Sequence, residues 1–174
     1  MTDPHVIVSE NNYHQKYMKN NIYPRWLVFS FLFLFSSVWT WGQTKISFDV
    51  SKGNVIFTDG SYLGKDSVGN NVTGTHNPGN HYIISGITEN YNVQVGAENA
   101  LVTKNFIIYL DSVDIRRKEN QVCAFSVWNK GNSVVAVILK NGSQNKLYSG
   151  RNRAGLEKSG GTSGTGTLLI TCEE

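Results

Sequence analysis

The segment Phe106-Ile-Ile-Tyr-Leu-Asp-Ser-Val-Asp-Ile115 decides the fold class, because it is the strongest β-forming run in the chain. Its β-branched and aromatic residues favour an extended strand. Similar runs lie on both sides of it, and no window of useful length shows the 3.6-residue periodicity of a helix. The sequence therefore predicts an all-β protein.

The other expected strands are short apolar runs separated by clusters of Gly and Asn, which tolerate the backbone angles of tight corners. The stretch 59–80 holds five glycines and few large apolar residues, so it is predicted to be a long loop. The expected strands beside the central one are 46–50, 54–58, 81–85, 92–95, 123–128, 133–139 and 167–172.

Four of these runs resemble one another, those around Ile83, Ile107, Val135 and Leu169, and their spacings are 24, 28 and 34 residues. An imperfect period of about 20–50 residues is typical of stacked repeats. In a β-solenoid each coil buries its apolar side only by stacking on its neighbours, and Asn suits the corners because its side chain can bond to its own backbone. The spacing favours a solenoid over an antiparallel β-sandwich, whose strands would recur about every 8–12 residues.

An ordered series of motifs resembles a known family. After Phe106–Ile115 come Cys123-Ala-Phe-Ser-Val127, then Val135-Ala-Val-Ile-Leu139, then Leu147-Tyr-Ser-Gly-Arg-Asn-Arg-Ala-Gly-Leu156. This order is similar to the repeats of secreted bacterial right-handed β-helix proteins of the carbohydrate-binding and adhesin-like kind, over about residues 82–172. The resemblance implies a pectin-lyase-like, right-handed parallel β-helix with a role at the cell surface or in glycan binding.

The chain departs from that family at its C-terminus. Members of the family usually continue for further coils, whereas this chain stops at Glu174 just after a strand. An open last coil leaves an unpaired strand edge. The resemblance therefore implies a truncated solenoid that is a fragment or a natural truncation, or else a partner that covers the edge in place of the missing coils.

The N-terminal region has the pattern of an export signal. An uncharged apolar run, 26–38, follows Lys19 and Arg25. It has the length of a signal-peptide core and falls short of the roughly 18 residues of a membrane span. Small residues at Thr40 and Gly42 fit a cleavage site. An uncleaved signal anchor is the alternative interpretation.

The sequence thus divides into a signal region, 1–42, and a single β-solenoid domain, 43–174. Translation is expected to begin at Met18, which starts a better signal than the polar segment before it. The protein is expected to be secreted, periplasmic or at the cell surface, and to meet the membrane only through the export signal.

Charge excludes one class of partner. Beyond residue 42 there are 13 Lys and Arg against 11 Asp and Glu, interspersed along the chain. Nucleic-acid binding needs a basic stripe or patch, so it is not expected.

The two cysteines, Cys123 and Cys172, could form a disulfide in an oxidising compartment, or each could be buried as a free thiol. Their spacing does not match a zinc site, and no cofactor is expected. Calcium remains open. Asp111 and Asp114, three apart in one strand, are expected to point to opposite faces, which disfavours a shared calcium unless a corner intervenes.

Candidate ligand-binding residues are cations and aromatic residues near the predicted corners. Arginines brought together by stacked coils could grip the carboxylates of an acidic polysaccharide, and aromatic rings could stack on sugars. Ordinary solvated charge and core packing are the alternative interpretations. The candidates are Arg116, Arg117, Arg151, Arg153, Trp128 and Tyr148.

Catalytic residues cannot be assembled from the sequence, since no convincing Ser/His/Asp or Cys/His arrangement is present. A non-catalytic binding or adhesion module is therefore expected, with a polysaccharide or a cell-surface glycan as its partner. The alternatives are a polysaccharide lyase on the same fold and a truncated structural fragment of a larger surface protein.

Overall fold

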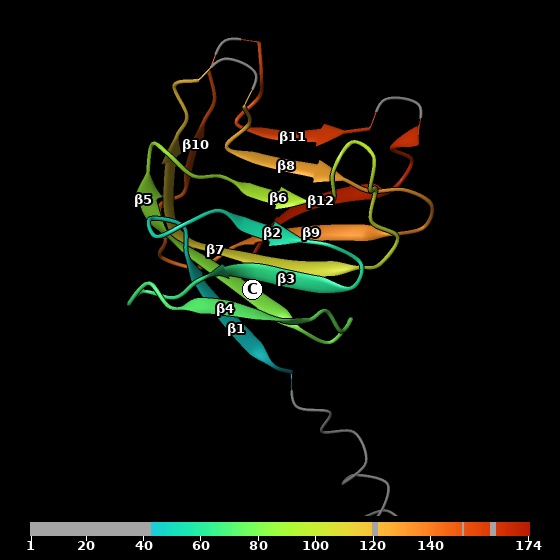
Figure 1. Ribbon diagram of the computed structural model, residues 1–174, viewed down its shortest axis with the longest axis horizontal. Coiled ribbons are helices and arrows are strands. Elements are labelled where there is room, and N and C mark those ends of the chain that lie inside the picture. The colour runs from blue at the N-terminus through green and yellow to red at the C-terminus, as the bar shows by residue number, and fades with distance from the viewer. Residues whose placement is uncertain (1–42, 120–121, 151, 161–162) are drawn as a thin grey trace, which may run out of the picture. The chain divides into compact units, whose positions relative to one another are not determined.

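The computed structural model describes residues 43–119, 122–150, 152–160 and 163–174, so the predicted signal region 1–42 and Arg151 lie outside the described residues. The described residues form a β-solenoid of about four turns (Figure 1). In this part of the chain, no helix is long and apolar enough to cross a bilayer. The strands are β1 (Lys45–Asp49), β2 (Val55–Phe57), β3 (Ser61–Lys65), β4 (Asn71–Thr75), β5 (His81–Thr88), β6 (Val93–Val95), β7 (Phe106–Arg116), β8 (Phe125–Trp128), β9 (Val134–Leu139), β10 (Lys146–Tyr148), β11 (Leu156–Ser159) and β12 (Thr167–Cys172).

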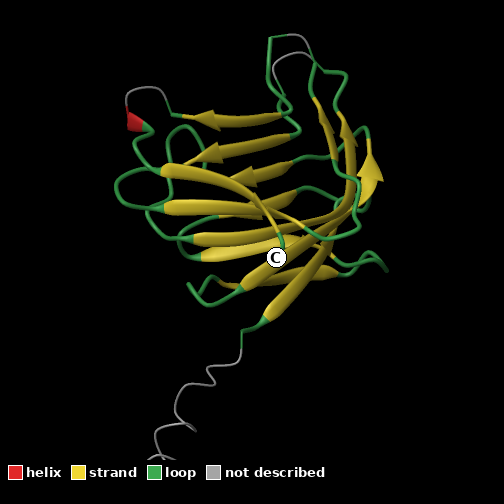
Figure 2. Cartoon of the chain, turned by 180° about the vertical axis from the view of Figure 1, so that it is seen from behind, coloured by secondary structure: helices red, strands yellow, loops and turns green. Residues whose placement is uncertain are grey.

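Two six-stranded sheets form the walls of the solenoid. Sheet A has the order β1-β5-β7-β9-β12, and β10 pairs with the second half of β7. Sheet B has the order β11-β8-β6-β2-β3-β4. All pairs are parallel in sheet A, and those from β2 to β11 are parallel in sheet B, so each coil adds a strand to both walls (Figures 1 and 2). The predicted parallel β-helix is confirmed, and the antiparallel sandwich is wrong.

The long strand β7 turns a corner in its middle. Ser112 lies at the corner with a φ of 61°, and the pairing with β5 shifts its register at the same level. Because the corner resets the alternation, Leu110 and Val113 are both buried although they are three residues apart. Asp111 and Asp114 follow those two buried residues on separate sides of the corner, and both face outward. The prediction that they point to opposite faces of one strand is therefore wrong.

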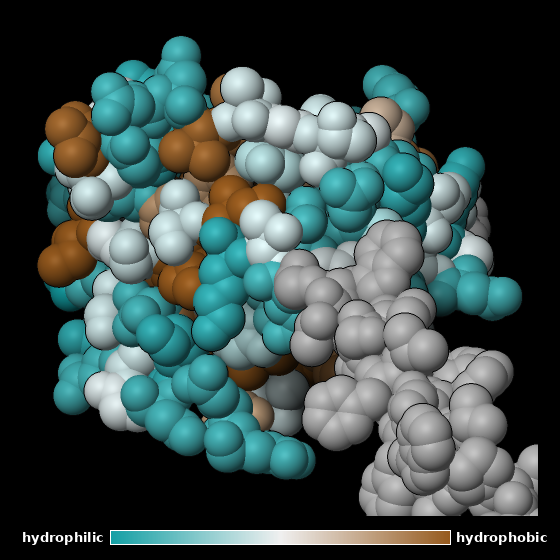
Figure 3. Space-filling view, turned by 90° about the horizontal axis from the view of Figure 1, so that it is seen from below, coloured by the Kyte–Doolittle hydropathy of each residue, from teal (hydrophilic) through white to brown (hydrophobic). Residues whose placement is uncertain are grey.

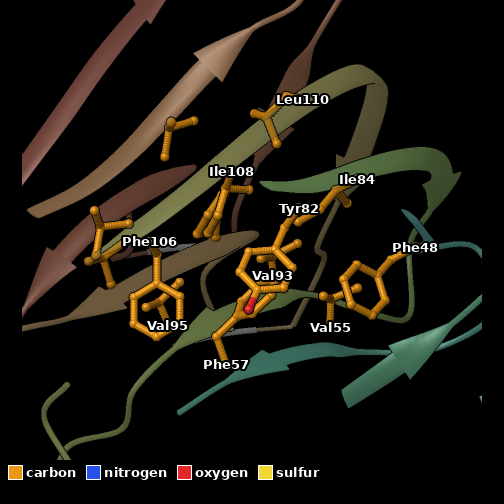
Figure 4. Close-up of a cluster of buried hydrophobic side chains, with 14 of the residues drawn as sticks. Phe48, Val55, Phe57, Tyr82, Ile84, Val93, Val95, Phe106, Ile108 and Leu110 are labelled. Atoms are coloured by element: carbon orange, nitrogen blue, oxygen red, sulfur yellow. The ribbon is translucent and has the colours of Figure 1, made fainter. Parts of the chain in front are cut away.

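The core consists of side chains stacked from coil to coil. The strand register places Phe48 beside Ile84 and Ile84 beside Leu110, and each of these is at most 1% exposed. The rings of Phe57 and Tyr82 lie 4.7 Å apart between the two sheets (Figure 4). Burying such side chains stabilises a fold by about 25 cal/mol per Å² of apolar surface, so the stacked columns supply the main driving force.

The segment 59–80 contains the antiparallel hairpin β3–β4, so the prediction of a long loop there is wrong. β3 pairs with β2 and extends sheet B beyond the first coil. Tyr62 and Val72 pack on the core, and Gly64 lies against the ring of Phe48. Only one side of the hairpin is packed, which explains why its sequence has few apolar residues. Seen from this end, the surface not covered by grey atoms is largely hydrophilic with scattered apolar side chains (Figure 3).

His76, which follows β4, ties the hairpin to the core. Its side chain is 1% exposed and stacks on Phe106 with ring centroids 3.9 Å apart. Its Nδ1 lies 2.6 Å from the hydroxyl of Tyr82. Burial lowers the pKa of His76, against a smaller opposing effect of the Asn105 backbone.

Asparagine side chains at the corners join neighbouring coils. Asn105 Oδ1 accepts a hydrogen bond from the Val134 amide at 2.8 Å, and Asn145 Oδ1 accepts one from the Val113 amide at 2.9 Å. Asn129, which is fully buried, also donates to the backbone of the next coil. We expected such side chains to bond to their own backbone, and stacking instead puts a backbone group of the adjacent coil within reach.

The other end of the solenoid presents the expected strand edge. β12 pairs with β9 on one side and with no other strand of the described residues. By its register with Val137, Ile170 points inward, yet it is 54% exposed. A hollow of about 350 Å³ opens beside it, lined by Leu139, Leu147 and Leu156 among others.

Gly64→Ala is expected to lower the free energy of unfolding by about 1–3 kcal/mol, because an added Cβ would lie 2.4 Å from Cδ1 of Phe48 in a packed core. Gly60→Ala is the matched control, since nothing lies within 4 Å of its added Cβ. Urea unfolding of both variants is the measurement. Equal stability of the two variants would show that the hairpin is not packed on the first coil.

His76 makes stability depend on pH. Its folded pKa is below its ordinary value, so its contribution is fully present above about pH 6.5 and is lost as the pH falls through that value toward the folded pKa. We expect the stability advantage of the wild type over His76→Gln, measured by urea unfolding, to shrink from about pH 7.5 to about pH 5. An advantage that stays constant or grows in acid would contradict this.

Candidate functional site

The outer face of sheet B is hollowed beside Trp128, the last residue of β8. Two adjoining hollows of about 220 and 510 Å³ share the lining residues Glu98, Trp128, Arg153 and Ser159. Together they are called the Trp128 groove here. Among the strands, β6, β8 and β11 contribute lining residues, and the loops that follow β6 and β10 contribute others.

The parallel register of sheet B brings the strand residues of the groove together. Trp128 lies beside Ser159 of β11, and Ser126 lies between Gln94 of β6 and Glu157 of β11. Because side chains alternate between the two faces of a strand, these residues share the outer face while their neighbours in β6 and β8 are buried in the core. Three successive coils therefore contribute to one surface.

The loop 96–105 forms a wall of the groove, and it passes beside the ends of β6 and β8 (Figure 1). Glu98 projects from the tip of the tight turn 97–100, which is closed by two backbone hydrogen bonds. The loop is fixed to β8 because the Val102 amide donates to the Trp128 carbonyl at 2.9 Å. Gly96 has a φ of 72°, and an added Cβ would lie 2.4 Å from that same carbonyl, so only glycine fits.

Glu157 is the centre of the polar network in the groove. Its carboxylate accepts hydrogen bonds from Cys123 Sγ at 2.9 Å, from Arg153 Nη1 at 2.6 Å and from Ser159 Oγ at 2.6 Å. Partial burial alone would raise the pKa of Glu157, but the hydrogen bonds outweigh it and lower the pKa. Glu157 is therefore a fixed negative charge near neutral pH.

The two cysteines are free thiols, so the disulfide that the sequence left open is not formed. Cys123 is buried just before β8 of sheet B, whereas Cys172 is exposed at the end of β12 of sheet A. Their places on different walls explain why they do not pair. Burial, followed by the hydrogen bond with Glu157, raises the pKa of Cys123 to about 12. Cys123 is therefore a protonated donor and not a nucleophile.

Comparisons of this chain with protein-family models, with curated proteins and with solved structures give no match.

The predicted ligand-binding residues fall into separate places. Trp128 and Arg153 lie together in the groove. Arg116 and Tyr148 lie together elsewhere, on the outer side of the second half of β7 and of β10, with the Arg116 guanidinium 5.8 Å from the ring centroid of Tyr148. Arg151 lies outside the described residues.

The arginines near the end of β7 are engaged in ion pairs. Arg116 donates two hydrogen bonds to Asp114, at 2.8 and 2.7 Å. The side chain of Arg117 is 6% exposed and pairs with Glu119. These cations are therefore already compensated by acids of the same chain, which weakens the idea of a basic patch.

A metal centre has little support from the acids that the sequence singled out. Asp111 pairs with Lys140 at 2.6 Å, and Asp114 pairs with Arg116 at 2.7 Å. Across the described ranges of the chain, no three His, Cys, Asp or Glu side chains come together as a potential metal site.

Sequence reasoning missed Glu98, Glu157, Gln94 and Ser159 as groove residues. Glu98 lies in a loop without a motif, and β11 was not among the expected strands. The only signal in the sequence was the alternation of polar with apolar residues around Phe125 and Leu156, and its use requires the register between the coils.

The environment of Cys123 predicts selective thiol chemistry. Iodoacetamide at about pH 8 is expected to label Cys172 at least about tenfold faster than Cys123, because Cys123 is buried and almost wholly protonated. Peptide mass spectrometry gives the two rates, and urea-unfolded protein serves as the control in which they become similar. If neither thiol reacted before a reductant was added, the two cysteines would form a disulfide after all.

Proposed function

We propose that this protein is an exported, non-catalytic β-helix module of the pectin-lyase-like kind that binds carbohydrate in the Trp128 groove. The observation that carries the proposal is one half-buried aromatic side chain ringed by hydrogen-bonding groups from three coils. The apolar face of a sugar ring stacks on aromatic surfaces, while its hydroxyls need donors and acceptors around the ring.

The composition of the groove supports this function. Trp128 supplies a flat apolar surface, and Leu101 and Val122 extend the apolar part of the lining. Around them lie the amide of Gln94 and the hydroxyl of Ser159, besides the charged side chains. The mixture of one large ring with many short polar groups suits a sugar better than a purely apolar ligand.

The rigidity of the groove also supports binding. Its strand residues lie on hydrogen-bonded sheet, and the loop 96–105 is anchored at both ends. The Asp59 carboxylate accepts hydrogen bonds from the Thr103 amide at 2.8 Å and from the Lys104 amide at 3.0 Å. A surface that is fixed before the ligand arrives loses less conformational entropy on binding.

The lyase alternative has weaker support. A lyase needs a free base beside the sugar, and Arg153 and Lys158, the basic residues that line the groove, are both bonded to other groups of the protein. Cys123 is protonated and donates to Glu157. The geometry of the groove therefore favours holding a sugar over transforming it.

Trp128→Ala is expected to weaken polysaccharide binding at least about tenfold, because it removes the stacking surface. Tyr148→Ala, which removes an exposed aromatic ring from another face, is the matched control and is expected to bind like the wild type. Affinity gel electrophoresis against a panel of polysaccharides is the measurement. Wild-type binding by Trp128→Ala would place the glycan site elsewhere.

A further inference from the structure

Four charged residues line the Trp128 groove, two of each sign. Glu98 and Glu157 are the anions, and Arg153 and Lys158 are the cations. Lys158 is the register partner of the buried Val127, so its side chain extends from the other face of β11. The groove is therefore not the basic surface that an acidic polysaccharide would need for ionic binding.

Both cations are engaged within the protein. Arg153 Nη1 lies 2.6 Å from Glu157 Oε1, and Lys158 Nζ donates to the Gly164 carbonyl. The positive charge of Arg153 is therefore already compensated by Glu157, so an incoming carboxylate would gain little from pairing with Arg153.

Glu157 also lies close to the stacking surface. It faces outward two residues before Ser159, which is the register partner of Trp128, so Glu157 and Trp128 are diagonal neighbours on one face. Diagonal neighbours in a sheet have their backbones about 7–8 Å apart. A carboxylate on a sugar stacked over Trp128 would stand near this fixed anion, in a hollow where water screens the repulsion less than in bulk solvent.

Neutral sugars suit the same groups. A hydroxyl can donate to the carboxylates of Glu98 and Glu157, and it can accept from N–H groups of Arg153 that do not point at Glu157. None of the internal ion pairs has to break for these bonds to form.

We infer that the Trp128 groove selects neutral sugars and rejects sugars that carry a carboxylate or a sulfate. The inference rests on the proposed carbohydrate binding. The preferred ligand is therefore different from the acidic polysaccharide that the arginines of the sequence suggested.

The test uses pairs of polysaccharides that share a backbone and differ in charge. Polygalacturonate is compared with fully methyl-esterified polygalacturonate, and carboxymethyl cellulose with hydroxyethyl cellulose, within a panel that also holds neutral glucans, mannans, xylans and chitin oligosaccharides. The purified protein is studied by affinity gel electrophoresis and by calorimetry. The expected result is that the tightest ligand is neutral and binds at least about tenfold more tightly than any acidic member of the panel.

Variants identify the groups that set the selectivity. Glu98→Gln and Glu157→Gln are tested separately and together. They are expected to lower the ratio of the affinity for the neutral member of a pair to the affinity for the acidic member at least about threefold. Asp114→Asn is the matched control, because it removes a carboxylate from another face and is expected to leave selectivity unchanged. Glu98→Gln keeps the test valid if Glu157→Gln disturbs Arg153, since Glu98 lies at a loop tip.

The outcomes separate the two proposals. The selectivity would be overturned if acidic polysaccharides bound at least as tightly as neutral ones and Trp128→Ala abolished that binding. The proposal of carbohydrate binding would then remain intact. An unchanged affinity ratio in both glutamate variants would also overturn the selectivity. Folded protein that binds no member of the panel would overturn the proposed function, and the selectivity with it.

Discussion

Parallel pairing between the strands of successive coils is the interaction on which the rest of this structure depends. Because β5, β7 and β9 pair in register, Tyr82, Ile108 and Val137 lie side by side in one column, and all three are fully buried. A slip of one residue in any of these strands would turn its apolar side chains outward. The same register that builds the core therefore also fixes which side chains face outward.

At the ends and corners of the solenoid, pairing between coils does not supply a partner for every backbone group or cover every apolar column. At the N-terminal end, the hairpin β3–β4 covers the first coil, and the stacking of His76 on Phe106 closes the gap beside Tyr82. At the corners, buried asparagines such as Asn129 bond to backbone of the next coil, which satisfies groups that the strand ladder leaves over. These contacts allow polar corner residues such as Asn129 to lie against the buried core.

The Trp128 groove is a consequence of the same stacking. Because the coils differ in length, the loop 96–105 extends beside the ends of β6 and β8. The hydrogen bond from the Val102 amide to the Trp128 carbonyl fixes this loop and holds Glu98 over the outer face. The network around Glu157 joins residues that are as far apart in sequence as Cys123 and Ser159. A basic patch is disfavoured because the three candidate arginines that the structure describes, Arg116, Arg117 and Arg153, each pair with an acid of the same chain.

The sequence by itself determined the all-β class, the strands with strong apolar alternation and the stacking of coils, because these depend on local propensity and on a repeat that is visible along the chain. It also singled out Trp128 and Arg153. The hairpin within 59–80, the corner at Ser112 and the grouping of Glu98 and Glu157 with Trp128 were decided only by the tertiary structure. The physical reason is that each depends on what lies in the adjacent coil: a glycine that must sit against the Phe48 ring, a bend that resets the alternation, and a register that makes distant outward-facing residues neighbours.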